Sequence, residues 1–313
     1  MSRAAFITTL LAVGSLSMGA AGYQQAQQKK PVVRDIQKVR DNLYFISGGD
    51  VNEQATWTGG NTAAFVTDKG VVLVDTMNPG NGPSILQRVK SVTDKPVIMI
   101  INTHTHSDHS GSDNEFPATV EVVAHENTKA NMSKATCPPV TNCMAFKGDN
   151  ARYLPKRTYK DTMSLFSGKD QITLYYFGRG HTNGDTFVVF PAVRAMHTGD
   201  MFQTNWMPFI DVADNSGSAV EFGSTLQKAL AAIKNVDTVI GGHTPTVVTW
   251  NDFKESTEFY NDFVTSVQSG LRAGQSVDQI ANAYRVPAKY KGFTANPALV
   301  KANAQAIADE RRK

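Results

Sequence analysis

The chain has little net charge and no long apolar run beyond its first residues. Its 313 residues carry 31 Lys and Arg against 28 Asp and Glu, a formal charge of +3. Proteins that bind nucleic acid need a concentrated basic face, and so small an excess of positive charge does not indicate such a function. Only residues 29–40 are mildly basic, and we interpret them as part of a solvated linker. No stretch beyond the N-terminus is long enough for a transmembrane helix, which predicts no stable membrane anchor.

Cysteine is almost absent as well. The chain has two, Cys137 and Cys143. Two cysteines this close are expected to pair in an oxidising compartment. The bridge would lie in the long insertion between His109 and His181, where such insertions often shape a substrate cleft. A metal-binding or nucleophilic cysteine is the alternative, and we favour it less because other side chains supply enough ligands.

The N-terminus has the pattern of a secretory signal. Arg3 supplies a positive start, and residues 4–16 form an apolar stretch too short to span a bilayer. Small residues at 19–22 are suited to cleavage just before Gly22 or Tyr23. We therefore predict a signal peptide over residues 1–22 and a linker over 23–41, with its Gln-rich part disordered. No cysteine follows the apolar stretch to carry a lipid, so the mature protein is expected to be exported, to a periplasm or the cell exterior.

Histidine is also scarce, but it is concentrated. Three of the seven histidines fall within six residues, His104-Thr-His106-Ser-Asp108-His109. Imidazole and carboxylate are ligands that zinc prefers. The run follows the apolar residues 97–101, which are typical of a buried strand. The pattern predicts metal ligands on a loop at a strand end, held by a rigid scaffold, and the alternative is a solvated polar loop.

Three more ligand candidates, His181, Asp200 and His243, follow short apolar runs later in the chain. A glycine stands just before each of them, so that the backbone can approach a metal closely. Any one of them alone is weak evidence, because a lone buried histidine is more often a core residue with ordinary hydrogen bonds. Together with the six-residue run they supply seven ligands, which suits two metal ions.

The ordered pattern HxHxDH, then a distant His, an Asp and a last His, resembles that of the metallo-β-lactamase-fold hydrolases. The resemblance covers roughly residues 42–250, and it is specific for the superfamily but not for a substrate. It implies an α/β fold, a four-layer αββα sandwich with two central sheets between helices and the metal site at one sheet edge. It also implies a ligand set: His104, His106 and His181 at a first metal, Asp108, His109 and His243 at a second, and Asp200 bridging both.

The resemblance further implies a hydrolase with two zinc ions per chain as its cofactors. Two divalent ions lower the pKa of a shared water toward neutrality, and the resulting hydroxide attacks a carbonyl carbon. Asp108 takes the catalytic role in this scheme, because it orients the nucleophile and can shuttle its proton. Neither a serine nor a cysteine nucleophile is needed.

The substrate is less defined than the metal site. Position 200 carries Asp, where the best-known zinc β-lactamases of the family carry Cys or Ser, and this resembles glyoxalase-type thioesterases, lactonases and phosphodiesterases. Lactonases commonly have a tyrosine three residues later, where this chain has Gln203, and we find no basic C-terminal motif for glutathione. Export favours an external small molecule with a cyclic amide or ester bond. We therefore expect a β-lactamase-like hydrolase, with Phe202 and Trp206 as candidates to line its cleft.

Several alternatives stay open at this point. Within the hydrolases they are a lactonase and a glyoxalase-type thioesterase. From other classes they are an iron-dependent oxidoreductase of the same fold and a binding module without activity. The full set of seven ligands argues against a mononuclear iron site, and degenerate binding modules usually lose ligands.

Four polar residues near the ligands are given supporting or local roles. Asp75 and Asp185 are candidates to hydrogen-bond a ligand histidine and so set its tautomer, and the alternative for each is a turn residue. His125 is expected to make a local hydrogen bond or cap. His197 is expected to be packed in its strand, because strand alternation turns its side chain away from that of Asp200.

Apolar runs and their periodicity predict strands and helices in alternation, followed by a helical C-terminal part. We assign residues 42–250 to the metallo-β-lactamase-like domain and 251–313 to a helical extension packed on it. The pattern does not indicate an oligomeric state. Helices are expected over 83–92, 126–134, 219–234, 253–271, 277–284 and 297–312. Strands are expected over 43–47, 62–67, 70–74, 97–101, 120–123, 172–177, 186–190, 195–197 and 238–240.

Overall fold

Two β-sheets form the centre of the fold in the computed structural model, which describes residues 31–312. The predicted signal peptide, residues 1–22, and the first part of the linker, 23–30, lie outside the described residues. The described residues from Val33 onward form one compact unit.

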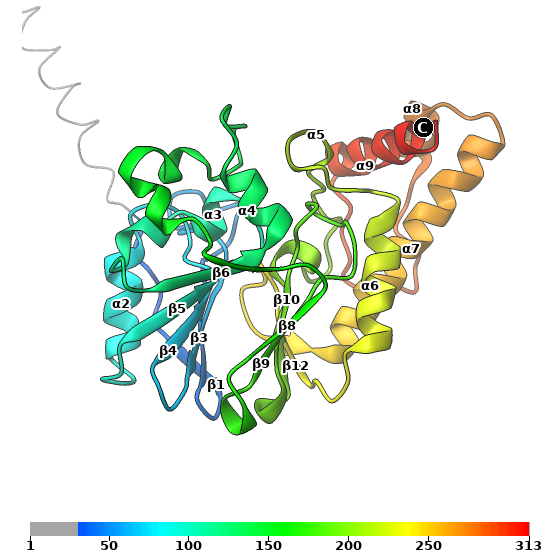
Figure 1. Cartoon of the computed structure of the whole chain (residues 1–313). Coiled ribbons are helices and arrows are strands. Elements are labelled where there is room, and N and C mark those ends of the chain that lie inside the picture. The colour runs from blue at the N-terminus through cyan, green and yellow to red at the C-terminus, as the bar shows by residue number, and fades with distance from the viewer. Residues whose placement is uncertain (1–30, 313) are drawn as a thin grey trace, which may run out of the picture. The chain divides into compact units, whose positions relative to one another are not determined.

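The first sheet has seven strands within the described residues, and they lie in the order of the sequence (Figure 1). Strands β1 to β4 pair antiparallel, whereas β4 to β7 pair parallel. Because neighbouring parallel strands point the same way, the loops that follow them meet at one edge of the sheet. The strands are β1 (Gln37–Arg40), β2 (Leu43–Ile46), β3 (Thr62–Val66), β4 (Val71–Val74), β5 (Val97–Ile101), β6 (Glu121–His125) and β7 (Arg157–Tyr159).

The second sheet has six strands among the residues described, in the order β13-β12-β11-β10-β9-β8. Its parallel pair is β11 with β12, which are joined through a helix, α6 (Glu221–Ala232), and the other pairs are antiparallel. The strands are β8 (Thr162–Leu165), β9 (Ile172–Tyr175), β10 (Phe187–Phe190), β11 (Ala195–His197), β12 (Thr238–Ile240) and β13 (Val248–Thr249).

Three apolar clusters bind these sheets and the helices into layers. Between the sheets, apolar residues of both pack together, and the rings of Phe65 on β3 and Phe190 on β10 have centroids 5.0 Å apart. The outer face of the first sheet packs against α2 (Gly82–Lys90) through Ile85 and Val89. Figure 1 shows α2 on one side of the sheets and α6 on the other. The structure thus has the four layers αββα, and the predicted fold class is confirmed.

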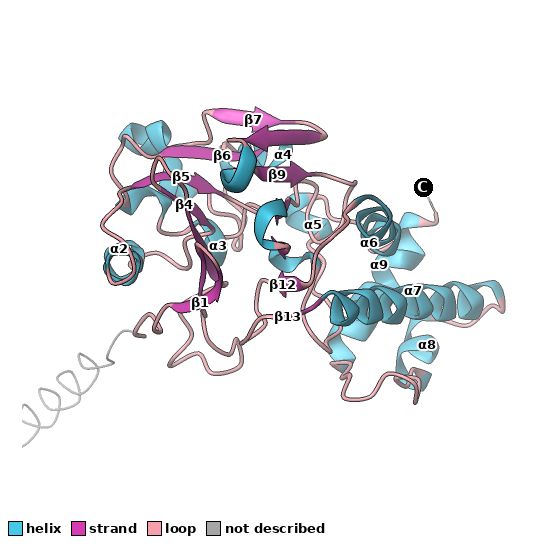
Figure 2. Ribbon diagram, turned by 90° about the horizontal axis from the view of Figure 1, so that it is seen from below, coloured by secondary structure: helices cyan, strands magenta, loops and turns pink. Residues whose placement is uncertain are grey.

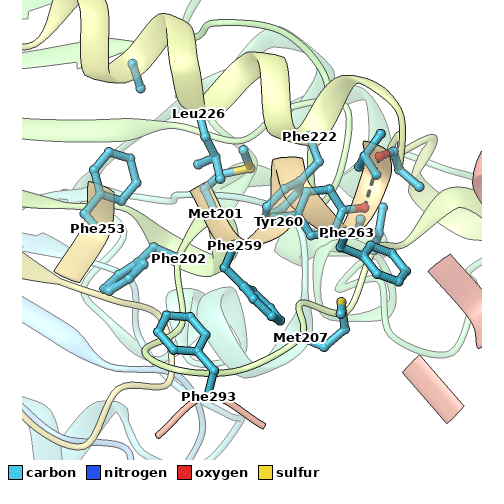
Figure 3. Close-up of a cluster of buried hydrophobic side chains, with 14 of the residues drawn as sticks. Met201, Phe202, Met207, Phe222, Leu226, Phe253, Phe259, Tyr260, Phe263 and Phe293 are labelled. Carbon is cyan, nitrogen blue, oxygen red and sulfur yellow. Dashed lines mark hydrogen bonds between the residues drawn. The ribbon is translucent and has the colours of Figure 1, made fainter. Parts of the chain in front are cut away.

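The largest cluster joins the second sheet to the C-terminal helices α7 (Trp250–Arg272), α8 (Val277–Ala283) and α9 (Pro297–Glu310). Helix α7 begins directly after β13 (Figure 2). Its first turn has a capping box, in which Thr249 and Asp252 hydrogen-bond each other's backbone N–H groups. Its apolar face buries Phe259, Tyr260 and Phe263 (Figure 3). The helices after residue 250 therefore share one core with the second sheet.

The strand boundaries differ from the sequence prediction mainly at the edges. Residues 37–40, which we had assigned to the linker, form β1 and pair with β2. This strand is mostly exposed and carries polar side chains, so it lacks the apolar pattern that marks a buried strand. Strands β7, β8 and β13 were missed for the same reason, since each has exposed or half-buried residues. In the part of the chain that the structure describes, no helix combines the length and hydropathy needed to cross a bilayer.

The connections between these elements contain three short α-helices and several 3-10 turns. The α-helices are α3 (Ser107–Ser110), α4 (Glu126–Met132) and α5 (Val212–Asn215). Helix α4 follows β6 directly, whereas residues 102–106 separate α3 from β5, and both helices lie at the sheet edge where the parallel strands end. That edge carries the predicted ligands.

Candidate metal centre

Four loops bring the seven predicted ligands together at one edge of the two sheets. The loop after β5 runs into α3 and carries the first four, and the loops after β9, β11 and β12 each carry one. The side chains form two groups, and within each group one potential ligand atom per residue lies within 4.8 Å of the others. The first group is His104, His106, His181 and Asp200, and the second is Asp108, His109 and His243.

Hydrogen bonds set which nitrogen of each histidine in the first group faces the centre. His106 Nε2 lies 2.9 Å from Asp211 Oδ2, and His181 Nδ1 lies 2.8 Å from the carbonyl oxygen of Phe209. The carbonyl oxygen only accepts, and so does the ionised carboxylate of Asp211. The facing ring nitrogens therefore carry the protons. The opposite nitrogens, His106 Nδ1 and His181 Nε2, then hold lone pairs in the neutral rings and lie 3.0 Å apart. Two lone pairs at this distance repel unless a cation or a proton lies between them.

His104 completes this group by the same logic. The hydroxyl of Thr103 donates its one proton to Asp75 Oδ2 at 2.7 Å, so it accepts from His104 Nδ1, which lies 3.0 Å away. His104 Nε2 is then a bare lone pair, and it is buried with no hydrogen-bond partner. A buried polar atom without a partner is rare and needs an explanation. The residues therefore fit a bound metal ion, with three imidazole nitrogens turned toward one point.

The second group is joined to the first through Asp200. His109 Nε2 and His243 Nε2 lie 3.3 Å apart, and each lies 3.2 Å from an oxygen of Asp200. The same carboxylate has Oδ2 3.6 Å from His181 Nε2 in the first group. Asp200 thus contacts both groups, which is the position that a bridging ligand requires. The side chain of Asp108 lies 3.2 Å from His243 Nε2.

The two groups differ in the charge that they favour. Burial, and then the neighbouring histidines, lower the pKa of His104 and of His181. In the second group burial also disfavours the charged form, but the carboxylates of Asp200 and Asp108 outweigh it and raise the pKa of His243 to about 9. These carboxylates favour positive charge at this position, whether that of protons or of a metal ion.

Glycines allow this close packing, as the sequence suggested. A Cβ at Gly242 would lie 1.8 Å from Asp200 Oδ1, and one at Gly60 would lie 2.3 Å from the ring of His109. Gly199, just before Asp200, has a φ of +51°, a left-handed conformation that side chains disfavour.

The two candidate supporting carboxylates have different roles. Asp75 accepts from His109 Nδ1 at 2.7 Å and from the backbone N–H of Thr103 at 2.8 Å. It therefore orients a ligand histidine. Asp185 instead accepts from the backbone and hydroxyl of Thr182, at 2.9 and 2.7 Å, and makes none of its hydrogen bonds to a ligand histidine. For Asp185 the turn interpretation is the correct one, because its carboxylate is used up within its own loop.

Sequence reasoning missed Asp211, which orients His106. The only local signal at this position is that of a helix N-cap, since its Oδ1 also accepts from the backbone of Asp214 and Asn215 at the start of α5. The contact with His106 spans 105 residues and has no local signal.

The two remaining histidines lie outside both groups. His125 caps α4 by accepting from the backbone N–H of Asn127 at 3.2 Å, as expected. His197 is buried in β11 and accepts from the backbone N–H of Gly199 at 3.1 Å. Its Nε2 lies 3.2 Å from the carbonyl oxygen of Asn61. Both nitrogens of His197 are thus used within the structure.

A cavity of about 430 Å³ lies over both groups, because His106 and Asp200 of the first group and Asp108 and His243 of the second line it. Most of the rest of its wall is apolar. Trp206 is part of the wall, as expected. Additional apolar wall residues, which the sequence did not reveal, are Val51, Trp57, Pro139, Val140, Phe209 and Leu299.

Phe202 does not line this cavity, and its prediction as a cleft residue was wrong. Its side chain is 3% exposed and packs edge-on against Phe253, with ring centroids 5.6 Å apart (Figure 3). The backbone is extended at Phe202, so neighbouring side chains point to opposite sides. Gln203 consequently faces the cavity, and Phe202 faces the helical core.

The disulfide between Cys137 and Cys143 is present. The loop that it closes lies against the ligand loop, because Ser107 N–H donates to the Val140 carbonyl at 3.0 Å and Asn142 N–H to that of Thr105 at 2.9 Å. The predicted link between this loop and the cleft is also seen, since residues 139 and 140 form part of the cavity wall.

Comparison with known proteins agrees with this geometry. The sequence profile described as the metallo-beta-lactamase superfamily matches residues 55–243. The chain is 27% identical over 273 residues to a metallo-beta-lactamase type 2 from Elizabethkingia meningoseptica, and the match covers 82% of this chain and 95% of that protein.

Two solved structures share the fold at low sequence identity. A metallo-beta-lactamase from Pontibacter korlensis has a TM-score of 0.58 and 17% identity, over 73% of this chain and 99% of that one. A stereoselective inverting sec-alkylsulfatase from Pseudomonas sp. has a TM-score of 0.67 and 13% identity, over 88% of this chain and 50% of that one. The chain belongs to the metallo-beta-lactamase superfamily. Within it, the protein is a hydrolase-like enzyme with a candidate metal site of histidine and aspartate side chains.

Proposed function

We propose that the protein is an exported hydrolase that holds two zinc ions, one in each ligand group, and opens a cyclic amide or ester of a small molecule. The observation that carries the proposal is the convergence of three unprotonated imidazole nitrogens in the first group. His106 Nδ1 and His181 Nε2 lie 3.0 Å apart, and His104 Nε2 is buried without a partner. Imidazole and carboxylate donors without thiolate suit zinc.

The chemistry requires a metal in both groups. When bound, two divalent ions supply a water of lowered pKa and polarise the carbonyl of the substrate. The chain's own residues do the rest. Asp200 contacts both groups and would be shared by the two ions. Asp75, Asp211 and the Phe209 carbonyl hold three of the ligand imidazoles in place, so that little freedom is lost on binding.

Asp108 is the residue to which we assign the proton transfer. Its side chain is 18% exposed and lines the cavity, so it can reach a substrate and a water there. Burial alone would raise the pKa of this carboxyl, but the charges of His109 and His243 hold it well below its usual range. Asp108 is therefore ionised, and its oxygens can orient the attacking water and accept its proton.

The assignment to an exported protein has two supports. The first is the secretory pattern of residues 1–22. The second is the disulfide in the loop beside the cavity, because disulfides persist in oxidising compartments and are rare in the cytosol.

One experiment tests the metal content and the reaction together. The full chain, purified without chelator, is loaded with zinc and analysed for metal, and it is then assayed on lactams, lactones, thioesters and phosphodiesters. We expect two equivalents of zinc and turnover of a lactam or lactone that stops with a chelator and returns with zinc. A plateau at one equivalent under saturating zinc would refute the two-ion site. Iron with redox activity, and no hydrolysis, would instead support an oxidoreductase of this fold.

A further inference from the structure

Exposed apolar side chains gather at the mouth of the cavity. Among the residues that the structure describes, five large apolar side chains are exposed, and they are Val32, Val140, Met144, Trp206 and Phe209. Three of these, Val140, Trp206 and Phe209, line the one cavity above Asp108. Single exposed apolar residues are ordinary, but a group around a cavity indicates a surface that contacts an apolar ligand.

The same cavity has no basic side chain. None of its lining residues is Lys or Arg, and the same holds for the two adjoining cavities of about 380 and 260 Å³ that share Trp206 with it. Lys134 and Lys147, in the segment that contains the disulfide loop, donate their ammonium groups to backbone carbonyls. Lys291 precedes a residue of one adjoining cavity but does not itself line it. An anionic group in the cavity would therefore find no Lys or Arg partner, and His243, which also lines it, is a metal ligand in the proposed function.

The net charge of the two ligand groups with their metal ions does not attract an anion either. Four carboxylates contact the ligand histidines, those of Asp75, Asp108, Asp200 and Asp211. Four negative charges balance the charge of two divalent ions, so the loaded site would carry no net positive charge. Moving an anionic side group from water into the apolar part of this cavity, away from the ions, costs free energy that no Lys or Arg side chain returns.

We infer that the cavity takes an uncharged substrate, a neutral cyclic amide or ester whose apolar group packs against Val140, Trp206 and Phe209. This inference rests on the proposed function and adds a limit to it, because the substrate carries no carboxylate, phosphate or sulfate. The disulfide loop supplies part of the apolar wall, since its residues Pro139 and Val140 lie in the lining.

Matched substrate pairs test the inference. One pair is a β-lactam with a free carboxylate and the methyl ester of the same lactam. The other is a lactone whose alkyl side chain ends in a methyl group or in a carboxylate. We expect kcat/KM to be about tenfold or more higher for the neutral member of each pair, and the difference to lie in KM, because one unpaired charge is worth at least that much. Equal values, or a preference for the anion, would overturn the inference and leave the proposed function standing.

A binding measurement decides the question even if neither member is hydrolysed, an outcome that would itself overturn the proposed function. Trp57 and Trp206 line the cavity, so a ligand there should quench their fluorescence. The ring-opened form of each pair is titrated into the zinc-loaded protein, and the neutral side-chain form should bind at least several-fold more tightly. Trp206→Phe should remove much of the signal. Tighter binding of the form with the additional anionic group would contradict the inference.

Two lysine variants give a matched control. Val140→Lys places a cation on the cavity wall, whereas Met144→Lys places one at a 70% exposed position that does not line the cavity. Val140→Lys should reduce the preference for the neutral member by about tenfold, and Met144→Lys should leave it unchanged. Metal content and melting temperature verify that both variants are folded. An unchanged preference in folded Val140→Lys would show that the wall does not meet the charged part of the substrate, and the inference would then be wrong.

Discussion

The two ligand groups differ in how firmly the chain holds them. In the first group all four residues are buried, and each histidine has its second ring nitrogen bonded to the protein. In the second group only His109 is held in this way, by Asp75. His243 Nδ1 is buried without a partner, and Asp108 is partly exposed in the cavity.

This difference suggests different roles for the two groups, with the first as the more rigid metal site and the second as the site nearer the reaction. A ring that is already oriented loses little freedom when it binds a metal, so the first group should bind its ion more tightly. Both groups border the cavity, but Asp108 of the second group is the most exposed of the four ligand residues that line it, and the second group is less restrained. We therefore expect the second group to meet substrate and water.

The largest effect is expected from Asp108, which belongs to the second group. Asp108→Asn keeps the size of the side chain but removes its charge and its capacity to accept a proton. Turnover should fall by at least about a hundredfold, the lower range for a positioned general base. Metal content should fall less, because the histidines and Asp200 remain. The measurements are kcat and elemental analysis on the same preparation.

Asp50→Asn is the matched control for this variant. Asp50 lines an adjoining cavity and hydrogen-bonds Asn52, but it contacts no predicted ligand. Its replacement should change turnover little. Near-full hydrolysis by Asp108→Asn with two ions bound would show that Asp108 neither positions the water nor accepts its proton.

The next effect separates the two groups through the carboxylates that orient them. Asp211→Asn weakens the hold on His106 and should lower the affinity for the first ion by about 10- to 100-fold, with little change at the second. Asp75→Asn acts on His109 directly and on His104 through Thr103, so it should weaken the second ion most and the first ion less. Competition with a chelator gives both affinities. If Asp211→Asn weakens the second ion as much as the first, the two groups are not independent.

The groups should also differ in their pH dependence. The pKa of His243, raised to about 9, means that a proton must leave before a metal binds, so affinity for the second ion should rise up to about tenfold per pH unit between pH 7 and 9. The pKa values of His104 and His181 are lowered, so these ligands are already neutral and the first ion should show a weaker dependence. Zinc titrations across this pH range measure how the affinity for each ion changes with pH. Equal pH dependence for the two ions would show that the two groups do not differ in this respect.

The same raised pKa has a consequence for the metal-free chain. A histidine whose pKa is higher in the folded state stabilises the fold below its unfolded value of 6.5, and this contribution is lost as the pH rises through about 9. Melting temperatures with chelator should therefore fall over this window more than those of the zinc-loaded protein. A parallel decline in both forms would contradict the role of His243.

The smallest effect is expected at the disulfide loop. Replacing both Cys137 and Cys143 by Ser should lower the free energy of unfolding by about 2 kcal/mol, the loop-closure value for so short a loop. KM should rise, because the loop carries part of the cavity wall, and metal content should not change. Denaturant unfolding and steady-state kinetics measure these quantities. Loss of metal would instead show that the loop holds the ligand loop in place.

Much of the fold and of the candidate metal site was visible in the sequence. The strands of the two sheet interiors were found because both their faces are buried, which requires continuous apolar runs such as residues 97–101. The edge strands β1 and β13 were missed because exposed strands carry no such requirement. Among the cavity residues Trp206 was found, whereas Phe202 was assigned to the wrong side of an extended segment. A shift of one residue reverses the face of an extended chain.

The sequence by itself determined the family, the sheet architecture and the seven side chains that meet at the sheet edge. These follow from residue type and short spacing, because imidazole and carboxylate donors after apolar runs retain their chemistry wherever the chain places them. Only the tertiary structure decided which groups orient those ligands and what the substrate meets. Asp211 reaches His106 across 105 residues, and the walls of the cavity come from seven separate segments, from residues 51–57 to residue 299. Such contacts depend on how the sheets, loops and C-terminal helices pack together, and no local pattern of residues encodes that packing.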